Sequence, residues 1–114
     1  MSPLQDGWSR QHVEHILAEG DPAELLHLPV AVSMDPPDAE WAQGICIELA
    51  GHSDAIVRGN ALLGFGHLAR TTGALDAAFV RPLIEDGRKD SDPYIRSQAE
   101  VAVEDTESFL GWRW

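Results

Sequence analysis

The chain has 114 residues, 44% hydrophobic and 24% charged, which fits one globular domain and excludes a disordered or collagen-like polypeptide. Nineteen Asp and Glu against eight Lys and Arg give a net charge of -11, which disfavours nucleic acid and anionic membranes as partners and allows a cationic protein. The alternative explanation of this negative charge is that it only keeps the protein soluble. No apolar run approaches the ~18 residues of a membrane-spanning helix, and residues 1–4 lack the start of a secretion signal, so we expect a cytoplasmic protein.

Turn residues divide the sequence into segments whose apolar spacing of three and four predicts helices. Ser9 caps a first helix that ends at Gly20. Asp21 and Pro22 open a short second helix, which Pro29 ends. The residues that follow are ambiguous up to a break that contains two prolines.

Beyond this break the same signals predict four more helices: residues 41–51, residues 55–71 with Asp54 as N-cap, residues 77–87 with Asp76 as N-cap, and residues 93–109 with Asp92 as N-cap. No segment alternates apolar and polar residues with β-branched enrichment, as a strand would. The sequence therefore predicts an all-α fold.

The second half of the chain contains an internal repeat. The stretch that begins at Trp41 matches the stretch that begins at Phe79, at an offset of 38 residues. The matching positions are Ser53-Asp54 and Ser91-Asp92, Val57-Arg58 and Ile95-Arg96, and Ala61 and Ala99. One helix pair cannot bury its apolar face alone, whereas stacked pairs can, so the repeat predicts a helical solenoid.

The repeated pattern of Ser-Asp, aliphatic-Arg and Ala resembles the HEAT-type repeat and its short bacterial relatives. This resemblance implies a short right-handed α-solenoid in one domain, residues 1–114, with repeats at 39–72 and 76–110 behind a helical N-terminal cap or degenerate repeat at 1–38. It also implies a ladder in which each Arg pairs with an acid six residues earlier. The ladder residues are Asp54, Arg58, Asp90 and Arg96: we expect Arg96 to bond to Asp90 or Asp54, whereas His52 takes the place of the acid for Arg58.

The fragment VRGNALLGFGHLAR at 57–70 is also similar to small bacterial HEAT-like proteins, some of which serve as immunity proteins beside secreted toxins. That resemblance implies protein binding without chemistry: an immunity protein that holds a cationic, nuclease-like toxin domain on its acidic concave side. The alternatives are a general adaptor or regulatory subunit of an enzyme complex, and a HEAT-like lyase that handles bilin chromophores. No cofactor is expected.

The helix at 55–71 has an unusual composition, because glycines at 59, 64 and 66 each cost about 1 kcal/mol relative to alanine in a helix interior. A bare apolar strip of this kind is covered either by the N-terminal helices or by a partner, which would then also meet an acidic rim on the last helix. The candidate partner-binding residues are Gly59, Leu62, Leu63, Gly66, Arg70, Glu100, Glu104 and Trp112.

The remaining motifs have mostly structural interpretations. Trp112 and Trp114 either lock the C-terminal tail onto the last repeat or anchor a partner. His12 and His15 have the spacing of two metal ligands, but the chain offers no recognisable third ligand, so no metal is expected. Cys46 lies in an apolar run and is expected to be a buried thiol. We find no catalytic motif and expect no enzyme activity.

Overall fold

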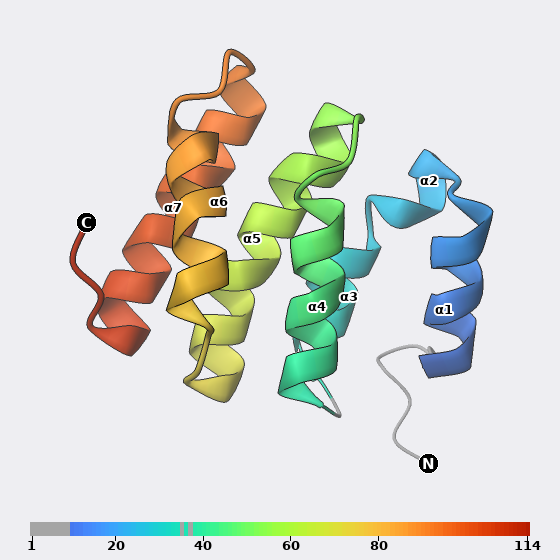
Figure 1. Ribbon diagram of the computed structural model, residues 1–114, viewed down its shortest axis with the longest axis horizontal. Coiled ribbons are helices and arrows are strands. Elements are labelled where there is room, and N and C mark those ends of the chain that lie inside the picture. Colours follow the sequence, from blue (N-terminus) through green and yellow to red (C-terminus); the bar gives the residue numbers. More distant parts are fainter. Residues whose placement is uncertain (1–9, 35, 37) are drawn as a thin grey trace.

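The computed structural model describes residues 10–34, 36 and 38–114 and is helical wherever it has regular secondary structure. The helices are α1 (Arg10–Glu19), α2 (Pro22–Leu25), α3 (Leu28–Met34), α4 (Ala39–Leu49), α5 (Ala55–Thr72), α6 (Ala77–Arg88) and α7 (Pro93–Leu110) (Figure 1). The all-α prediction is therefore confirmed for the described part of the chain. Ser9, the expected cap of α1, lies outside it.

Aspartates begin most of these helices, as the sequence predicts. Asp21, Asp54, Asp76 and Asp92 each accept a hydrogen bond from a backbone N–H in the first turn of α2, α5, α6 and α7. Asp38 does the same for α4 by accepting from the backbone N–H of Trp41. These bonds satisfy N–H groups that have no partner within the helix.

The expected role of Pro29 is wrong. The second helix is a single turn that is complete at Leu25, and Pro29 lies in the first turn of α3. A proline is tolerated there because its missing N–H would have no partner in any case. The residues after it, which the sequence leaves ambiguous, continue α3 to Met34.

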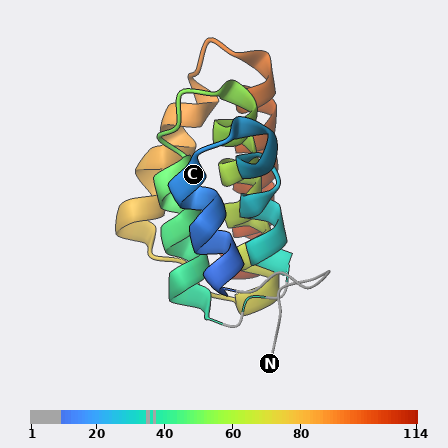
Figure 2. The same ribbon diagram turned by 90° about the vertical axis from the view of Figure 1, so that its right-hand side faces the viewer.

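The helices form two layers along the long axis of the molecule. Viewed from the N-terminal end, α1, α4 and α6 lie in one layer, whereas α3, α5 and α7 lie in the other (Figure 2). Neighbours along the chain run antiparallel across the layers, and α5 and α7 pack side by side as parallel neighbours (Figure 1).

One continuous apolar core lies between the layers. It runs from Val13 and Ile16 of α1 to Ala102 and Val103 of α7, and Phe65 of α5 is fully buried within it. Among the residues that the structure describes, no helix is long and apolar enough to cross a membrane.

Candidate protein-binding surfaces

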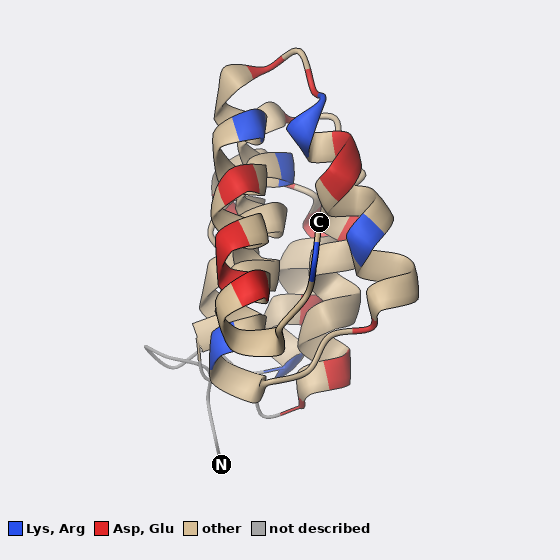
Figure 3. Ribbon diagram, turned by 90° about the vertical axis from the view of Figure 1, so that its left-hand side faces the viewer, with Lys and Arg blue, Asp and Glu red and all other residues tan. Residues whose placement is uncertain are grey.

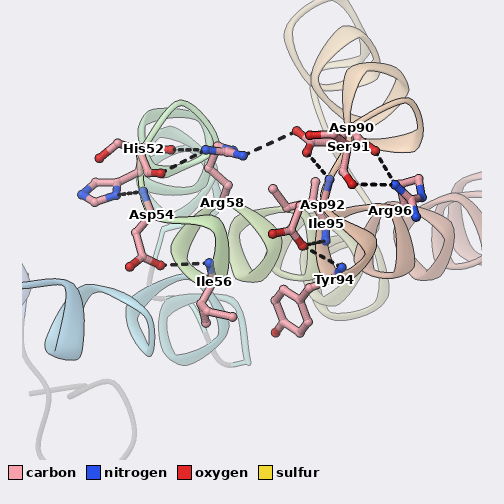
Figure 4. Close-up of polar contacts among 11 residues, drawn as sticks. His52, Asp54, Ile56, Arg58, Asp90, Ser91, Asp92, Tyr94, Ile95 and Arg96 are labelled. Carbon is pink, nitrogen blue, oxygen red and sulfur yellow. Dashed lines mark hydrogen bonds and ion pairs between the residues drawn. The ribbon is translucent and has the colours of Figure 1, made fainter.

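The expected ladder residues lie in the loops before α5 and α7 and in the first turn of each helix, and the main hydrogen bonds of the two loops match (Figure 4). Each arginine donates to two carbonyl oxygens of its own loop: Arg58 to those of His52 and Ser53, at 3.1 and 3.2 Å, and Arg96 to those of Asp90 and Ser91, at 2.7 and 3.0 Å. The repeat seen in the sequence therefore corresponds to a repeat of loop geometry.

The ladder differs from expectation in which groups pair. Arg96 meets Asp90 through the main-chain carbonyl, while the Asp90 carboxylate lies 3.5 Å from Nη2 of Arg58 in the first turn of α5. Asp54 makes no bond to Arg96, because its carboxylate is used to cap α5. His52 replaces the acid locally: its Nδ1 accepts from the Asp54 backbone N–H at 2.9 Å, as Asp90 Oδ1 accepts from that of Asp92 at 2.8 Å.

The apolar strip on the glycine-rich helix α5 is covered within the chain, and over Gly59 and Gly66 the cover is α7, which neither of the two expected alternatives named. A Cβ atom at Gly59 would lie 2.6 Å from the ring of Tyr94, and one at Gly66 would lie 2.5 Å from a carboxylate oxygen of Asp105. Both neighbours belong to α7. These two glycines therefore serve the close approach of α5 and α7.

The third glycine of α5 faces the other way, toward the N-terminal helices. A Cβ at Gly64 would lie 2.7 Å from Cys46 Sγ in α4 and 3.0 Å from the carbonyl oxygen of Pro29 in α3. Leu62 is also buried, whereas Leu63 is half-buried and Arg70 is exposed. Of the candidate residues on α5, only the last two thus reach solvent.

The remaining candidates reach solvent on α7 and the C-terminal tail. Glu100 and Glu104 are exposed and form an acidic row on α7 with Glu107. Figure 3 shows acidic segments following one another along this helix, at the C-terminal end of the molecule. The Glu100 carboxylate lies 3.0 Å from Nε of Arg88 on α6, so part of its charge is balanced within the chain.

The C-terminal tail folds back against α6 and α7. The guanidinium of Arg81 lies 5.4 Å from the ring centroid of Trp112 and 4.4 Å from that of Trp114, and Arg81 Nη2 donates to the Arg113 carbonyl at 2.6 Å. The Trp114 indole N–H donates to the hydroxyl of the buried Thr106 at 3.1 Å. The tail is therefore locked onto the last helix pair, one of the two outcomes expected. Trp112 stays half-buried.

Two titratable groups at or near the core, Cys46 and His67, have a pKa that burial shifts. Cys46 is fully buried, as expected, and burial raises the pKa of its thiol to about 12. His67 is half-buried beside Arg70, with Nδ1 2.6 Å from Nη2 of that arginine. Burial, and then the positive charge of Arg70, lower the pKa of His67, while Asp105 opposes this shift.

Within the described part of the chain, no three His, Cys, Asp or Glu side chains gather as metal ligands do, and His12 and His15 are exposed.

Sequence reasoning missed the residues that cover α5. Tyr94 and Asp105 close over two of its glycines, and the Tyr94 hydroxyl also donates to the side-chain oxygen of Asn60. Arg81, which holds both tail tryptophans, was missed as well. The signal for Tyr94, Asp105 and Arg81 was weak, because the residues that they contact lie far from them in the sequence.

No family model matches the chain, and no curated protein matches it significantly. Among solved structures, the chain is similar to a chain of a crystal structure described as "CDI complex from Cupriavidus taiwanensis LMG 19424". The two chains are 25% identical in sequence and superpose with a TM-score of 0.75, over 89% of each chain. The helical arrangement described above is therefore shared, over most of its length, with a chain of that complex.

Proposed function

We propose that this protein is a bacterial immunity protein that binds and neutralises a toxin domain and catalyses no reaction. The likeness to a chain of a CDI complex carries this proposal, because contact-dependent inhibition is a toxin–immunity system. The similarity extends over 89% of each chain at 25% identity, so the two chains share most of their helical arrangement.

The architecture that we propose is a short right-handed solenoid of HEAT-type helix pairs. The pairs α4–α5 and α6–α7 follow the 38-residue repeat, and the loops within them hold Arg58 and Arg96 in the same way. Helices α1 to α3 would then be the N-terminal cap, and the locked tail would close the other end. Stacked helix pairs present broad surfaces that suit protein binding.

The charge of the chain suggests the chemistry of its partner. A net charge of -11 favours association with a cationic protein, and a toxin that cleaves nucleic acid would have a positive active-site cleft. The acidic row on α7 is exposed, as such a surface must be. We place the interaction in the cytoplasm, where the single thiol of Cys46 would stay reduced.

We further propose that the toxin domain is encoded beside this gene, and growth of a bacterial host that expresses that domain tests the proposal. We expect growth to stop when the toxin domain is expressed alone and to be restored when this chain is expressed with it. A toxin domain from an unrelated locus serves as the control and should still stop growth. Failure to restore growth, with both proteins folded and abundant in the cell, would overturn the proposal.

A further inference from the structure

Gly44 in the middle of α4 is a glycine that the fold does not need. The described helices contain glycines at 44, 59, 64, 66 and 87, and at the last four a Cβ atom would lie 2.5 to 2.7 Å from a packed neighbour. At Gly44 a Cβ atom would meet nothing within 4 Å. Because glycine costs about 1 kcal/mol relative to alanine inside a helix, this position gives up stability without a packing reason.

Gly44 keeps open a groove between α1 and α4. The groove has a volume of about 520 Å³, within the ~300–1,000 Å³ typical of pockets that hold a ligand. It is lined by Leu17, Ala18, Trp41, Gly44 and Ile45, which give it an apolar floor, and by the carboxylates of Glu14, Glu40 and Glu48. A side chain at position 44 would project into this open space.

The three carboxylates of the groove are available to a partner. All three glutamates are exposed, and no Lys or Arg within residues 10–34, 36 and 38–114 forms an ion pair with any of them. Glu14 accepts a hydrogen bond from the indole N–H of Trp41 at 3.3 Å, which ties α1 to α4 across the groove. The groove thus combines apolar surface with uncompensated negative charge.

The chain itself shows which side chain suits such surroundings. Beside the groove, the guanidinium of Arg10 lies 4.8 Å from the ring centroid of Trp41, and its Nη2 lies 3.2 Å from a carboxylate oxygen of Asp38. An arginine therefore already uses an aromatic ring together with a carboxylate at this junction of α1 and α4. Cation–π contact and charge pairing both favour Arg or Lys over a neutral side chain.

We propose that the groove between α1 and α4 binds a Lys or Arg side chain from a basic surface of the toxin domain. The aliphatic part of that side chain would lie on the apolar floor, and its charge would pair with one of the carboxylates that line the groove, Glu14, Glu40 or Glu48. This inference rests on the proposed function and adds the place and chemistry of the contact. A second copy of this chain suits the groove poorly, because each copy carries a net charge of -11.

Two tryptophan substitutions, one inside the groove and one outside it, test the proposal with purified toxin domain. Gly44→Trp fills the groove, and we expect it to raise the dissociation constant on the order of tenfold or more, mainly by faster dissociation. Ala78→Trp places the same side chain on an exposed position of α6, outside the groove, and should bind like the wild type. Thermal unfolding of both variants checks that they are folded. Equal binding by Gly44→Trp and the wild type would overturn the proposal.

A short peptide, acetyl-Leu-Arg-Leu-Arg-amide, separates this inference from the proposed function. When it is titrated into the isotope-labelled protein, we expect the amide signal of Gly44 and the indole signal of Trp41 to shift. In Gly44→Trp the Trp41 shift should be lost, because the groove is filled, and both shifts can be followed in variants that keep Gly44. Replacing Glu40 and Glu48 with Gln should weaken them. If the toxin domain fails to bind the wild type, the proposed function fails. If the peptide leaves both signals unmoved, the groove is not a cation site and this inference fails.

Discussion

The packing of α5 against α3 and α4 predicts a clear cost for the substitution Gly64→Ala. The new Cβ would lie 2.7 Å from Cys46 Sγ and 3.0 Å from the carbonyl oxygen of Pro29, and both neighbouring residues are buried. Overpacking a core costs about 1–3 kcal/mol, and alanine returns about 1 kcal/mol of helix propensity. Because one of the two neighbours is a backbone atom that cannot rotate away, we expect a net loss of about 1–2 kcal/mol.

The same chemical change at Gly44 is the matched control. Nothing lies within 4 Å of a Cβ there, so Gly44→Ala should raise the free energy of unfolding by about 0.4–1 kcal/mol. Urea unfolding followed by far-ultraviolet circular dichroism measures both variants, and unchanged denaturant slopes would show that the unfolded state is the same. The reasoning is refuted if Gly64→Ala is as stable as the wild type, or if Gly44→Ala is less stable.

Three further predictions follow from the loops, the half-buried His67 and the acidic row on α7. Arg58→Ala should lower the free energy of unfolding by about 1–2 kcal/mol, and by more than Arg96→Ala, because only Arg58 also has an ion pair to the next loop; equal losses in urea unfolding would contradict this. The lowered pKa of His67 means that the unfolded state binds its proton more readily, so stability should fall as the pH drops below the ordinary value of 6.5, and His67→Gln should flatten that fall in pH-dependent unfolding curves. Replacing Glu100 and Glu104 together with Lys should slow association with the toxin domain at low salt and have little effect on dissociation, and an association rate that ignores both charge and salt would refute electrostatic steering.

Most of the helix boundaries could be predicted from the sequence because they depend on local chemistry. Asp54, Asp76 and Asp92 bond to backbone N–H groups two or three residues away, so their position before an apolar segment is enough to identify them. Pro29 shows the limit of this reasoning. A proline near a helix end has the same local signal whether it follows one helix or begins the next, and only the packing of α3 decides between them.

The candidate site was harder to predict because it depends on which helices meet. The glycines of α5 correctly indicated close approach, but the sequence could not show that Tyr94 and Asp105 of α7 would cover two of them. Gly44 gave no signal of its own, since a glycine that faces an open groove has the same sequence context as one that packs. The ladder residues could be predicted in part. Their positions followed from the repeat, but the pairing of the Asp90 carboxylate with Arg58 instead of Arg96 depended on the distance between the two loops.

The central claim is that this acidic helical protein binds a cationic toxin domain, and isothermal titration calorimetry of the purified proteins tests it most directly. The toxin domain should be the one encoded beside this gene, titrated at several salt concentrations. The account predicts a heat of binding and a dissociation constant that rises with the salt concentration, because opposite charges face each other across the interface. No heat of binding at any salt concentration, together with no complex by gel filtration, would contradict it.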